Sequence, residues 1–363
     1  MANPAIGTPR YLSATNGILP EATGQAISYI RRPDKFKVNQ YTQLIESPGT
    51  IGIYYIIDRD TPARFVNDAE SAWEDGGERP VTNANGLVFA EANFTTLRRN
   101  YATMLGNQAI AMGSKGWKVM EHHVGSLVQQ EITARTNRVC SLIDTAANWG
   151  NNTADANTLN NGAGTWDLAS DDPASANYNA IKRSLMEAVR RITLATNATV
   201  GFNDLQLVIS PGLAESMGNS AEIHNYLRNG PYSRPRLESK EDYVNDRWGL
   251  PATLYGLPLV VEDTVKVTDR PAAGGGTGAS ASSNRVFAKA DKTAVILSRP
   301  GSLDGEYGAP SFSTVQVYWH EYLAAVYTFQ DQKNARTELH VTSQYVEILA
   351  APESGFCITN ATA

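Results

Sequence analysis

The clearest pattern of hydrophobic and polar positions in the chain runs from Lys118 to Trp149. Apolar residues recur there every three or four positions, as they do on one face of a helix. The interior Gly125 weakens a helix by only about 1 kcal/mol relative to alanine. We therefore predict one uninterrupted helix over 118–149, roughly 45 Å long. The apolar positions behind this prediction are Met120, Val124, Leu127, Val128, Ile132, Val139, Leu142, Ile143 and Ala146.

The polar positions of this helix include Glu131, Arg135 and Arg138, but they lack the dense alternating charges of a coiled coil. We therefore expect the apolar stripe to lie on a sheet or on another folded part of the chain. Such a helix is typical of the long structural support of a flat, elongated molecule.

Two strand signals precede the helix. Residues 50–57 are rich in isoleucine and tyrosine and are bounded by Pro48-Gly49 and a charged run, and residues 86–94 form a second apolar run. Gly76-Gly77 lies between them and is typical of a turn. The pattern predicts a long two-stranded excursion, which needs a neighbour because isolated two-stranded ribbons are marginally stable in water.

Residues 1–35 show no sustained periodicity, and their prolines and glycines favour an extended conformation. The segment is nevertheless too apolar for a free tail. We expect an arm that lies on another surface, including that of another subunit.

Beyond the long helix the signals become shorter. Residues 151–170 are low in complexity and predict a loop, and Asp172-Pro173 predicts the start of a helix, because aspartate is a common N-cap and proline a common first helical residue. Ser210-Pro211 predicts a helix that ends at Gly230 and breaks at Gly218-Asn219. The predicted strands of this α/β or α+β region are 205–209, 250–261, 286–288 and 294–297.

The last part of the chain alternates in the manner of strands. Residues 312–329 and 338–349 predict long antiparallel strands with many aromatic residues. Residues 350–363 predict a closing tail punctuated by glycine and proline, and 271–284 an exposed flexible loop.

Composition limits the classes of function. The chain has 363 residues, 42% of them apolar, which is enough for one large or two medium domains. Its net charge of −6 argues against a general nucleic-acid binder. The two cysteines, Cys140 and Cys357, form no spacing motif and are expected to be buried free thiols. We find neither a signal-peptide pattern nor an apolar run long enough to cross a membrane.

No residue pattern predicts catalysis, a cofactor or a metal site. His122 and His123 are adjacent on a predicted helix, so their side chains diverge and cannot chelate one ion. The chain lacks a G-x-S-x-G turn, and the glycine-rich run 274–278 lacks the lysine and the strand-to-helix context of a phosphate-binding loop. We therefore expect no enzyme.

Two charged segments are candidates for contacts between subunits. Residues 58–79 hold seven acids and three arginines, whereas the arm carries the basic pair Arg31 and Arg32. We expect the tip of the excursion, with Glu74, Asp75 and Glu78, to meet Arg31 and Arg32 of a neighbour. Ordinary solubility explains both segments equally well.

The order of these elements resembles the major capsid protein of tailed bacteriophages, with its Hong Kong 97-type capsid fold. The resemblance covers essentially the whole chain as an order of elements. Two local runs also resemble the strand–helix and G-x-P-(apolar) stretches of the axial domain in such proteins: FNDLQLVISPGLAESM (202–217) and LYGLPLVVEDTV (254–265). It implies an α+β fold with five parts. These are an N-terminal arm (1–35), an E-loop region with an extended two-stranded E-loop (36–110), a peripheral domain with a spine helix (111–180, helix 118–149), an axial domain (181–310), and a return to the peripheral domain with a C-terminal tail (311–363).

The resemblance also implies function and partners. Copies of the chain would assemble as hexamers and pentamers into an icosahedral shell around packaged DNA, which is contacted only non-specifically. The protein would be assembled in the host cytoplasm and reside in the virion. Many family members begin with a helical scaffolding segment, whereas here the arm starts at Met1. A separate scaffolding protein is therefore an implied partner. The resemblance also implies a portal and leaves a decoration protein open, and it implies no membrane.

Three alternatives stay open. Encapsulins share this fold, so a bacterial nanocompartment shell that carries a cargo is the nearest one. A soluble α+β enzyme with a site assembled from scattered residues is a second, although no motif supports it. A tail or adhesin protein is a third, but such proteins are typically richer in β repeats and lack a single long helix.

Overall fold

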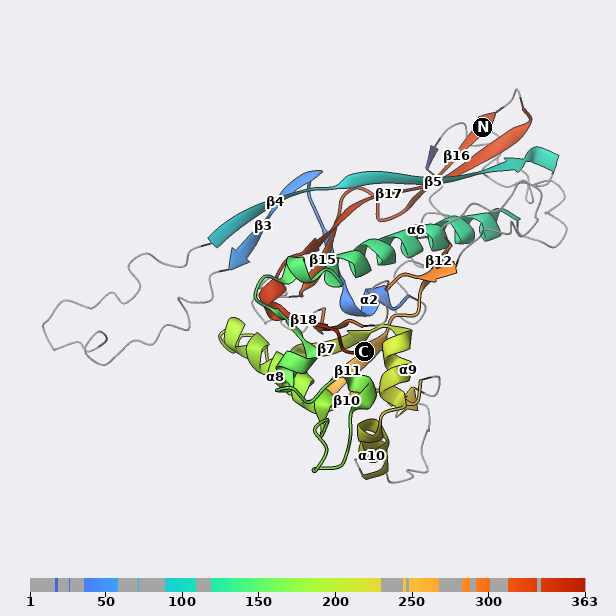
Figure 1. Cartoon of the computed structure of the whole chain (residues 1–363). Coiled ribbons are helices and arrows are strands. Elements are labelled where there is room, and N and C mark those ends of the chain that lie inside the picture. Colours follow the sequence, from blue (N-terminus) through green and yellow to red (C-terminus); the bar gives the residue numbers. More distant parts are fainter. Residues whose placement is uncertain are drawn as a thin grey trace, which may run out of the picture.

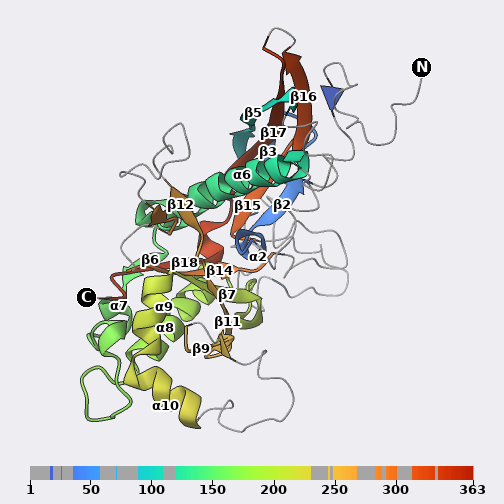
Figure 2. The same ribbon diagram turned by 90° about the vertical axis from the view of Figure 1, so that its right-hand side faces the viewer.

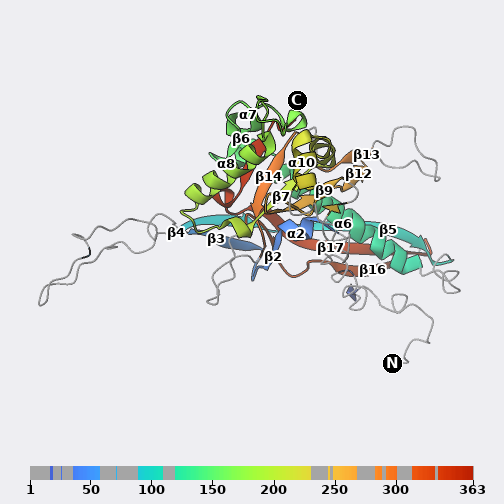
Figure 3. The same ribbon diagram turned by 90° about the horizontal axis from the view of Figure 1, so that it is seen from below.

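The computed structural model has a mixed α+β fold built of two six-stranded sheets with helices between and beyond them (Figures 1 and 2). The long helix α6 (Val119–Ile143) lies between the sheets, and α8 (Ala180–Ala195) and α9 (Pro211–Gly218) lie on the far side of the second sheet. A ribbon of two strands, β3 (Ile51–Ile57) and β4 (Phe89–Thr95), lies at one end of the molecule. The opposite end holds β5 (Leu97–Gly106) and β16 (Ala325–Asp331) (Figures 1 and 3). The structure describes residues 17–18, 26, 36–57, 71, 89–108, 119–229, 244–245, 248–267, 283–287, 292–300, 313–331 and 334–362.

The first sheet is organised around its longest strand, β17 (Arg336–Leu349). Along one side, β17 pairs antiparallel with β5 (Leu97–Gly106). Along its other side it pairs with two strands in succession, β16 (Ala325–Asp331) and β15 (Val315–Trp319). The outer strands are β2 (Gln43–Glu46), parallel to β15, and β1 (Gly17–Ile18), antiparallel to β16. The predicted strand 338–349 is confirmed.

The predicted single strand 312–329 is wrong in one respect, because it breaks into β15 and β16. His320 N–H donates to Gln344 O, and Gln344 N–H donates to Tyr322 O, so the chain leaves the ladder opposite Gln344 and returns. Glu321 has a φ of 56°, in the left-handed region. No glycine or proline marks the break, which hides it in the sequence.

The long helix is confirmed, but it ends earlier than predicted. α6 spans Val119–Ile143 and packs on β17 and β5, with its apolar stripe buried as expected. A separate 3-10 turn, Ala146–Trp149, follows it. The Trp149 indole N–H donates to Ile143 O at 2.9 Å, and the Asn148 amide donates to Leu142 O at 2.9 Å. These side chains occupy carbonyls that further helical N–H groups would need, so the helix stops.

The second sheet has the order β10-β11-β7-β14-β18-β6 and is buried on both faces. Alternate residues of its strands face different cores: Val208, Val295 and Cys357 belong to the core under α6, whereas Leu207 and Ile296 belong to the core under α8. The continuous apolar runs in the sequence follow from this arrangement. Its strands are β6 (Thr153–Asp155), β7 (Leu205–Ile209), β10 (Thr253–Leu254), β11 (Leu257–Val261), β14 (Ala294–Ser298) and β18 (Phe356–Thr359).

Two segments that the sequence predicts as a loop and a tail contribute strands to the second sheet. Residues 151–170, predicted as a loop, contain β6, α7 (Ala156–Leu159) and the turn Trp166–Leu168, and Trp166 is fully buried in the second core. That core therefore begins well before residue 181. The closing tail is also ordered, because β18 pairs with both β14 and β6.

Of the helices predicted around the second sheet, one is confirmed and one begins later than predicted. The helix at Ser210-Pro211 is confirmed: the Ser210 hydroxyl accepts from Leu213 N–H at 3.2 Å, and the break separates α9 (Pro211–Gly218) from α10 (Ala221–Asn229). The helix start at Asp172-Pro173 is wrong. The Asp172 carboxylate accepts from Ala174 N–H within a tight turn, and α8 (Ala180–Ala195) begins later.

Three two-stranded ribbons complete the fold. β3 (Ile51–Ile57) and β4 (Phe89–Thr95) pair antiparallel, as predicted for these two runs, whereas the tip of the predicted excursion at Gly76-Gly77 lies outside the described residues. β12 (Val265–Val267) pairs with β13 (Ser283–Arg285), so the predicted strand 286–288 is displaced; Val286 and Phe287 are instead buried after the strand ends. The third ribbon joins β8 (Val244–Asn245) to β9 (Leu250–Pro251).

Candidate assembly surfaces

The β3–β4 ribbon is anchored to the first sheet through one of its faces. Gly52, Tyr54 and Phe94 share this face, and the Phe94 ring stacks on Tyr318 of β15 with ring centroids 4.3 Å apart. A Cβ at Gly52 would come within 2.3 Å of the Phe94 ring. Position 52 therefore has to be glycine for the ring to reach Tyr318, and this contact orients the ribbon.

The other face of the ribbon presents large apolar side chains to solvent. Ile51 and Ile53 are 69% and 48% exposed, and they lie opposite Thr95 and Asn93. Adjacent exposed isoleucines on one ribbon face are typical of a surface that another molecule covers. This is the strongest candidate contact surface among the described residues.

The outer face of the first sheet, away from α6, carries a second apolar pair. Met104 and Phe329 lie on either side of Glu338 and are 61% and 40% exposed. Beside them, the His340 ring meets Phe329 edge-on at 5.0 Å and lies 2.9 Å from the Asn100 amide nitrogen. The mixture of apolar and polar groups is typical of a protein contact surface rather than a catalytic site.

The β12–β13 ribbon adds a third exposed apolar surface. The Lys266 ammonium donates to the Asn137 side-chain oxygen of α6 at 2.8 Å, so Lys266 points toward the helix. Val265 and Val267, its neighbours in β12, point the other way and are more than half exposed. The alternation of side chains along a strand produces this surface.

The positive end of α8 is occupied from within the chain. The Glu222 carboxylate, buried on α10, accepts from Ile181 N–H and Lys182 N–H at 2.9 Å each, and from the Tyr255 hydroxyl at 2.6 Å. Burial, together with the neighbouring carboxylate, raises the pKa of Tyr255, so the hydroxyl stays a donor. The helix N-terminus is thus already satisfied by the chain's own anion.

A largely buried polar cluster lies where α6 meets β17, and no pattern in the sequence indicates it. Arg138 donates from Nε to Glu347 at 2.6 Å and from Nη2 to the Tyr345 hydroxyl, while Arg99 donates to Tyr345 O at 2.8 Å. Glu131 and Arg135 are also fully buried. On sequence grounds these positions resemble the ordinary polar face of a helix, since periodicity does not reveal a buried polar residue.

The predicted contact residues Arg31, Arg32, Glu74, Asp75 and Glu78 all lie outside the residues that the structure describes. Their pairing between subunits therefore stays a prediction. Within the described ranges, no group of three histidine, cysteine or acidic residues is placed to hold a metal ion, and no helix is long and apolar enough to span a membrane.

Comparison with known proteins gives matches in structure only. No protein-family model and no curated protein sequence matches the chain. A phage-related protein from Bordetella bronchiseptica RB50 matches with a TM-score of 0.62 at 12% identity, over 96% of this chain and 99% of that one. The capsid protein of cyanophage P-SCSP1u matches with a TM-score of 0.53 at 11% identity, over 90% and 88%. The expected resemblance is confirmed, and the chain has the fold of tailed-bacteriophage major capsid proteins.

Proposed function

We propose that this chain is the major head protein of a tailed bacteriophage, and that its copies assemble as hexamers and pentamers into an icosahedral shell around packaged DNA. The observation that carries the proposal is the match in fold to a cyanophage capsid over about nine tenths of both chains. A structural role without catalysis fits the absence of a recognisable catalytic motif in the sequence.

The parts of the fold receive roles within this proposal. Residues 1–35 are the N-terminal arm, and the β3–β4 ribbon is the base of the E-loop. α6 is the spine helix of the peripheral domain, which the first sheet completes. The second sheet with α8 and α9 is the axial domain near the capsomer centre, and its boundary lies nearer residue 153 than residue 181.

The exposed apolar surfaces support self-association. A single subunit leaves Ile51, Ile53, Met104, Val265 and Val267 in contact with water. Stable interfaces bury roughly 800 Å² per partner, and association that removes such surfaces from water stabilises the folded chain. The net charge of −6 suits a shell that encloses DNA without binding it tightly.

The partners follow from the same proposal. A scaffolding protein guides the shell to closure, and a portal occupies one vertex. Assembly takes place in the host cytoplasm, and the product is the virion.

Expression of the full chain, followed by size-exclusion chromatography and negative-stain imaging of the earliest peak, tests the proposal. We expect closed particles of uniform diameter or capsomer-sized rings. The same experiment is repeated with the candidate scaffolding protein from the neighbouring gene. A chain that stays monomeric in both experiments would overturn the proposal.

A further inference from the structure

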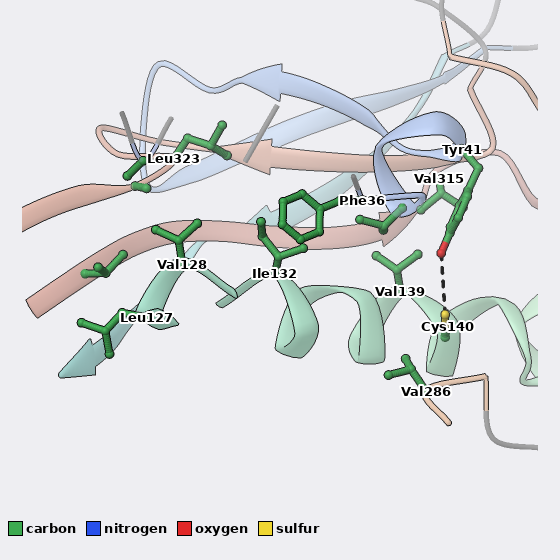
Figure 4. Close-up of a cluster of buried hydrophobic side chains, with 14 of the residues drawn as sticks. Phe36, Tyr41, Leu127, Val128, Ile132, Val139, Cys140, Val286, Val315 and Leu323 are labelled. Carbon is green, nitrogen blue, oxygen red and sulfur yellow. Dashed lines mark hydrogen bonds between the residues drawn. The ribbon is translucent and has the colours of Figure 1, made fainter. Parts of the chain in front are cut away.

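A short segment of the chain connects the two sheets. It comprises α2 (Val38–Tyr41) and β2, and we call residues 37–46 the bridging segment. A single residue, Thr42, separates α2 from β2, and β2 pairs with β15, so the end of the segment is fixed to the first sheet. Val38 and Tyr41 are buried in the core under α6, where the Tyr41 hydroxyl points toward Cys140 (Figure 4).

The beginning of the bridging segment is bonded to the second sheet. The Tyr41 hydroxyl donates to Glu262 Oε2 at 2.8 Å. The Lys37 ammonium donates to Val261 O at 2.8 Å and lies 3.1 Å from the Asp263 carboxylate. Because Val261 is the last residue of β11, all these contacts reach the same end of one strand. The segment thus ties β11 of one sheet to β15 of the other.

Glu262 makes this connection specific. Its side chain is fully buried, and its other oxygen accepts from Thr264 N–H at 3.1 Å and from the Thr264 hydroxyl. A buried carboxylate requires such donors, and among the described residues Tyr41 is the donor that comes from the far side of the connection. Burial and the nearby Cys140 and Glu262 keep the pKa of Tyr41 well above its usual value, so its hydroxyl remains a donor.

The remaining contacts between the sheets are mostly apolar. Val208, Val260 and Val295 of the second sheet pack into the core under α6. Apolar packing is not directional, whereas a hydrogen bond to a buried charge tolerates little change in angle or distance. Two other polar contacts lie in this region. Lys266 donates to Asn137 of α6, a separate element from the first sheet, and Ser298 N–H of β14 donates to the hydroxyl of Thr314, the residue before β15, at 2.8 Å each. The second bond joins neutral groups, so it lacks the buried charge of the Tyr41–Glu262 contact.

We propose that the bridging segment, through Tyr41–Glu262 and Lys37, fixes the angle between the two sheets and thereby the curvature of the assembled shell. The link from this angle to the curvature of the shell rests on the proposed function. Closed assemblies form only where the rotation from one copy to the next closes on itself. A subunit with a variable internal angle gives variable rotation, and hence shells of mixed size or open sheets.

The claim that the bridging segment fixes the angle between the sheets is tested on the full chain with Tyr41→Phe. The matched control is Tyr255→Phe, which also removes a tyrosine hydroxyl bonded to a buried glutamate, but one that packs against the second core and does not reach the first sheet. Spin labels are attached at Ala102→Cys on β5 and Leu194→Cys on α8, two exposed positions. The native cysteines are buried and are not expected to react.

We expect Tyr41→Phe to shift or broaden the label–label distance distribution beyond its original width, and Tyr255→Phe to leave it unchanged. If Tyr41→Phe does not fold, Lys37→Met tests the same connection at a half-buried position. An unchanged distribution in a folded Tyr41→Phe or Lys37→Met variant overturns the inference.

The link from this angle to the curvature of the shell is tested by imaging particles formed from unlabelled variants. We expect Tyr41→Phe to yield several particle diameters or open sheets, and Tyr255→Phe to yield one diameter. Normal particles together with a shifted distance distribution overturn the link to curvature. If even the unaltered chain forms no particles, the proposed function fails, while the distance measurement still decides whether the bridging segment fixes the angle.

Discussion

Glu131 and Arg135 lie one turn apart on α6 with fully buried side chains, yet no hydrogen bond joins them in the described part of the chain. Arg135 donates from Nη2 to Asn39 at 2.7 Å, while its Nε and Nη1 atoms and both oxygens of Glu131 find no partner there. Buried charges with unmet hydrogen bonds are costly. This pair therefore weakens the contact between α6 and the first sheet.

Replacing both residues by methionine tests this conclusion. We expect the double variant Glu131→Met plus Arg135→Met to match the original chain or exceed it by about 1 to 4 kcal/mol in free energy of unfolding. Arg135→Met alone should lose about 3 to 5 kcal/mol, because it leaves Glu131 buried without its neighbouring cation. Urea unfolding of all three proteins gives the comparison. A double variant as unstable as the single one would show that the pair stabilises the fold.

Glu131 also predicts a dependence of stability on pH. Burial raises the pKa of this carboxyl, although Arg135 acts in the opposite direction. The folded chain therefore holds the proton to higher pH than the unfolded chain. Its contribution to stability falls as pH rises from the unfolded pKa to the folded pKa, and is constant above.

Glu131→Gln removes this titration. We expect the difference in unfolding free energy between Glu131→Gln and the original chain to move in favour of the variant as pH rises from about 4 to 8. Parallel urea titrations across that range measure it, and other titrating groups cancel in the difference. A difference that stays constant with pH would contradict the raised pKa.

Two glycines make opposite predictions. Gly52→Ala should push Phe94 off Tyr318, because the new Cβ would lie 2.3 Å from the ring. Gly125→Ala is the matched control, since a Cβ there meets nothing within 4 Å. We expect Gly125→Ala to stabilise the chain by up to about 1 kcal/mol and Gly52→Ala to destabilise it. Thermal unfolding compares them; equal effects would mean that the ribbon does not depend on the Phe94 contact.

The sequence predicted those elements whose stability comes from a repeating pattern. The helix from Val119 and the strands β7 and β17 were found because each buries one face or both faces over many residues. α2 was missed because four residues are too few for periodicity to show. The sequence of β18 resembles a tail because its partners β14 and β6 lie far away in the chain.

The candidate surfaces were predicted less well, for a related reason. The charges in residues 58–79 predict a contact surface at the tip of the excursion. The exposed apolar residues of the ribbon, Ile51 and Ile53, resemble the core positions of any strand, so the sequence does not indicate their exposure. Likewise, Tyr41 and Glu262 are far apart in sequence, and nothing local to either residue indicates that they meet.

The exposed face of the ribbon gives a prediction about assembly. Ile51→Glu plus Ile53→Glu should leave the subunit folded, because both side chains already face solvent, and should prevent particle formation if this face is covered by a neighbour. The control, Ile51→Leu plus Ile53→Leu, keeps the apolar area and should assemble normally. Sedimentation and circular dichroism distinguish loss of assembly from loss of folding. Normal particles from the glutamate variant would remove this face from the list of contacts.

The charged segments give the last prediction, which concerns pairing between subunits. If these acids meet Arg31 and Arg32 of a neighbour, Glu74→Lys plus Asp75→Lys places like charges opposite each other across the interface. We then expect the particles to be destabilised, and most strongly at low salt concentration, where the repulsion is least screened. Adding Arg31→Glu and Arg32→Glu to the same chain restores opposite charges and should restore stability. Exposed ion pairs are screened at a distance of about 8 Å in physiological salt, so light scattering is recorded from low to high salt. Particle stability that is unchanged by the lysine substitutions at every salt concentration would exclude the pairing, and a lysine defect that the compensating glutamates do not reverse would assign the acids a different partner.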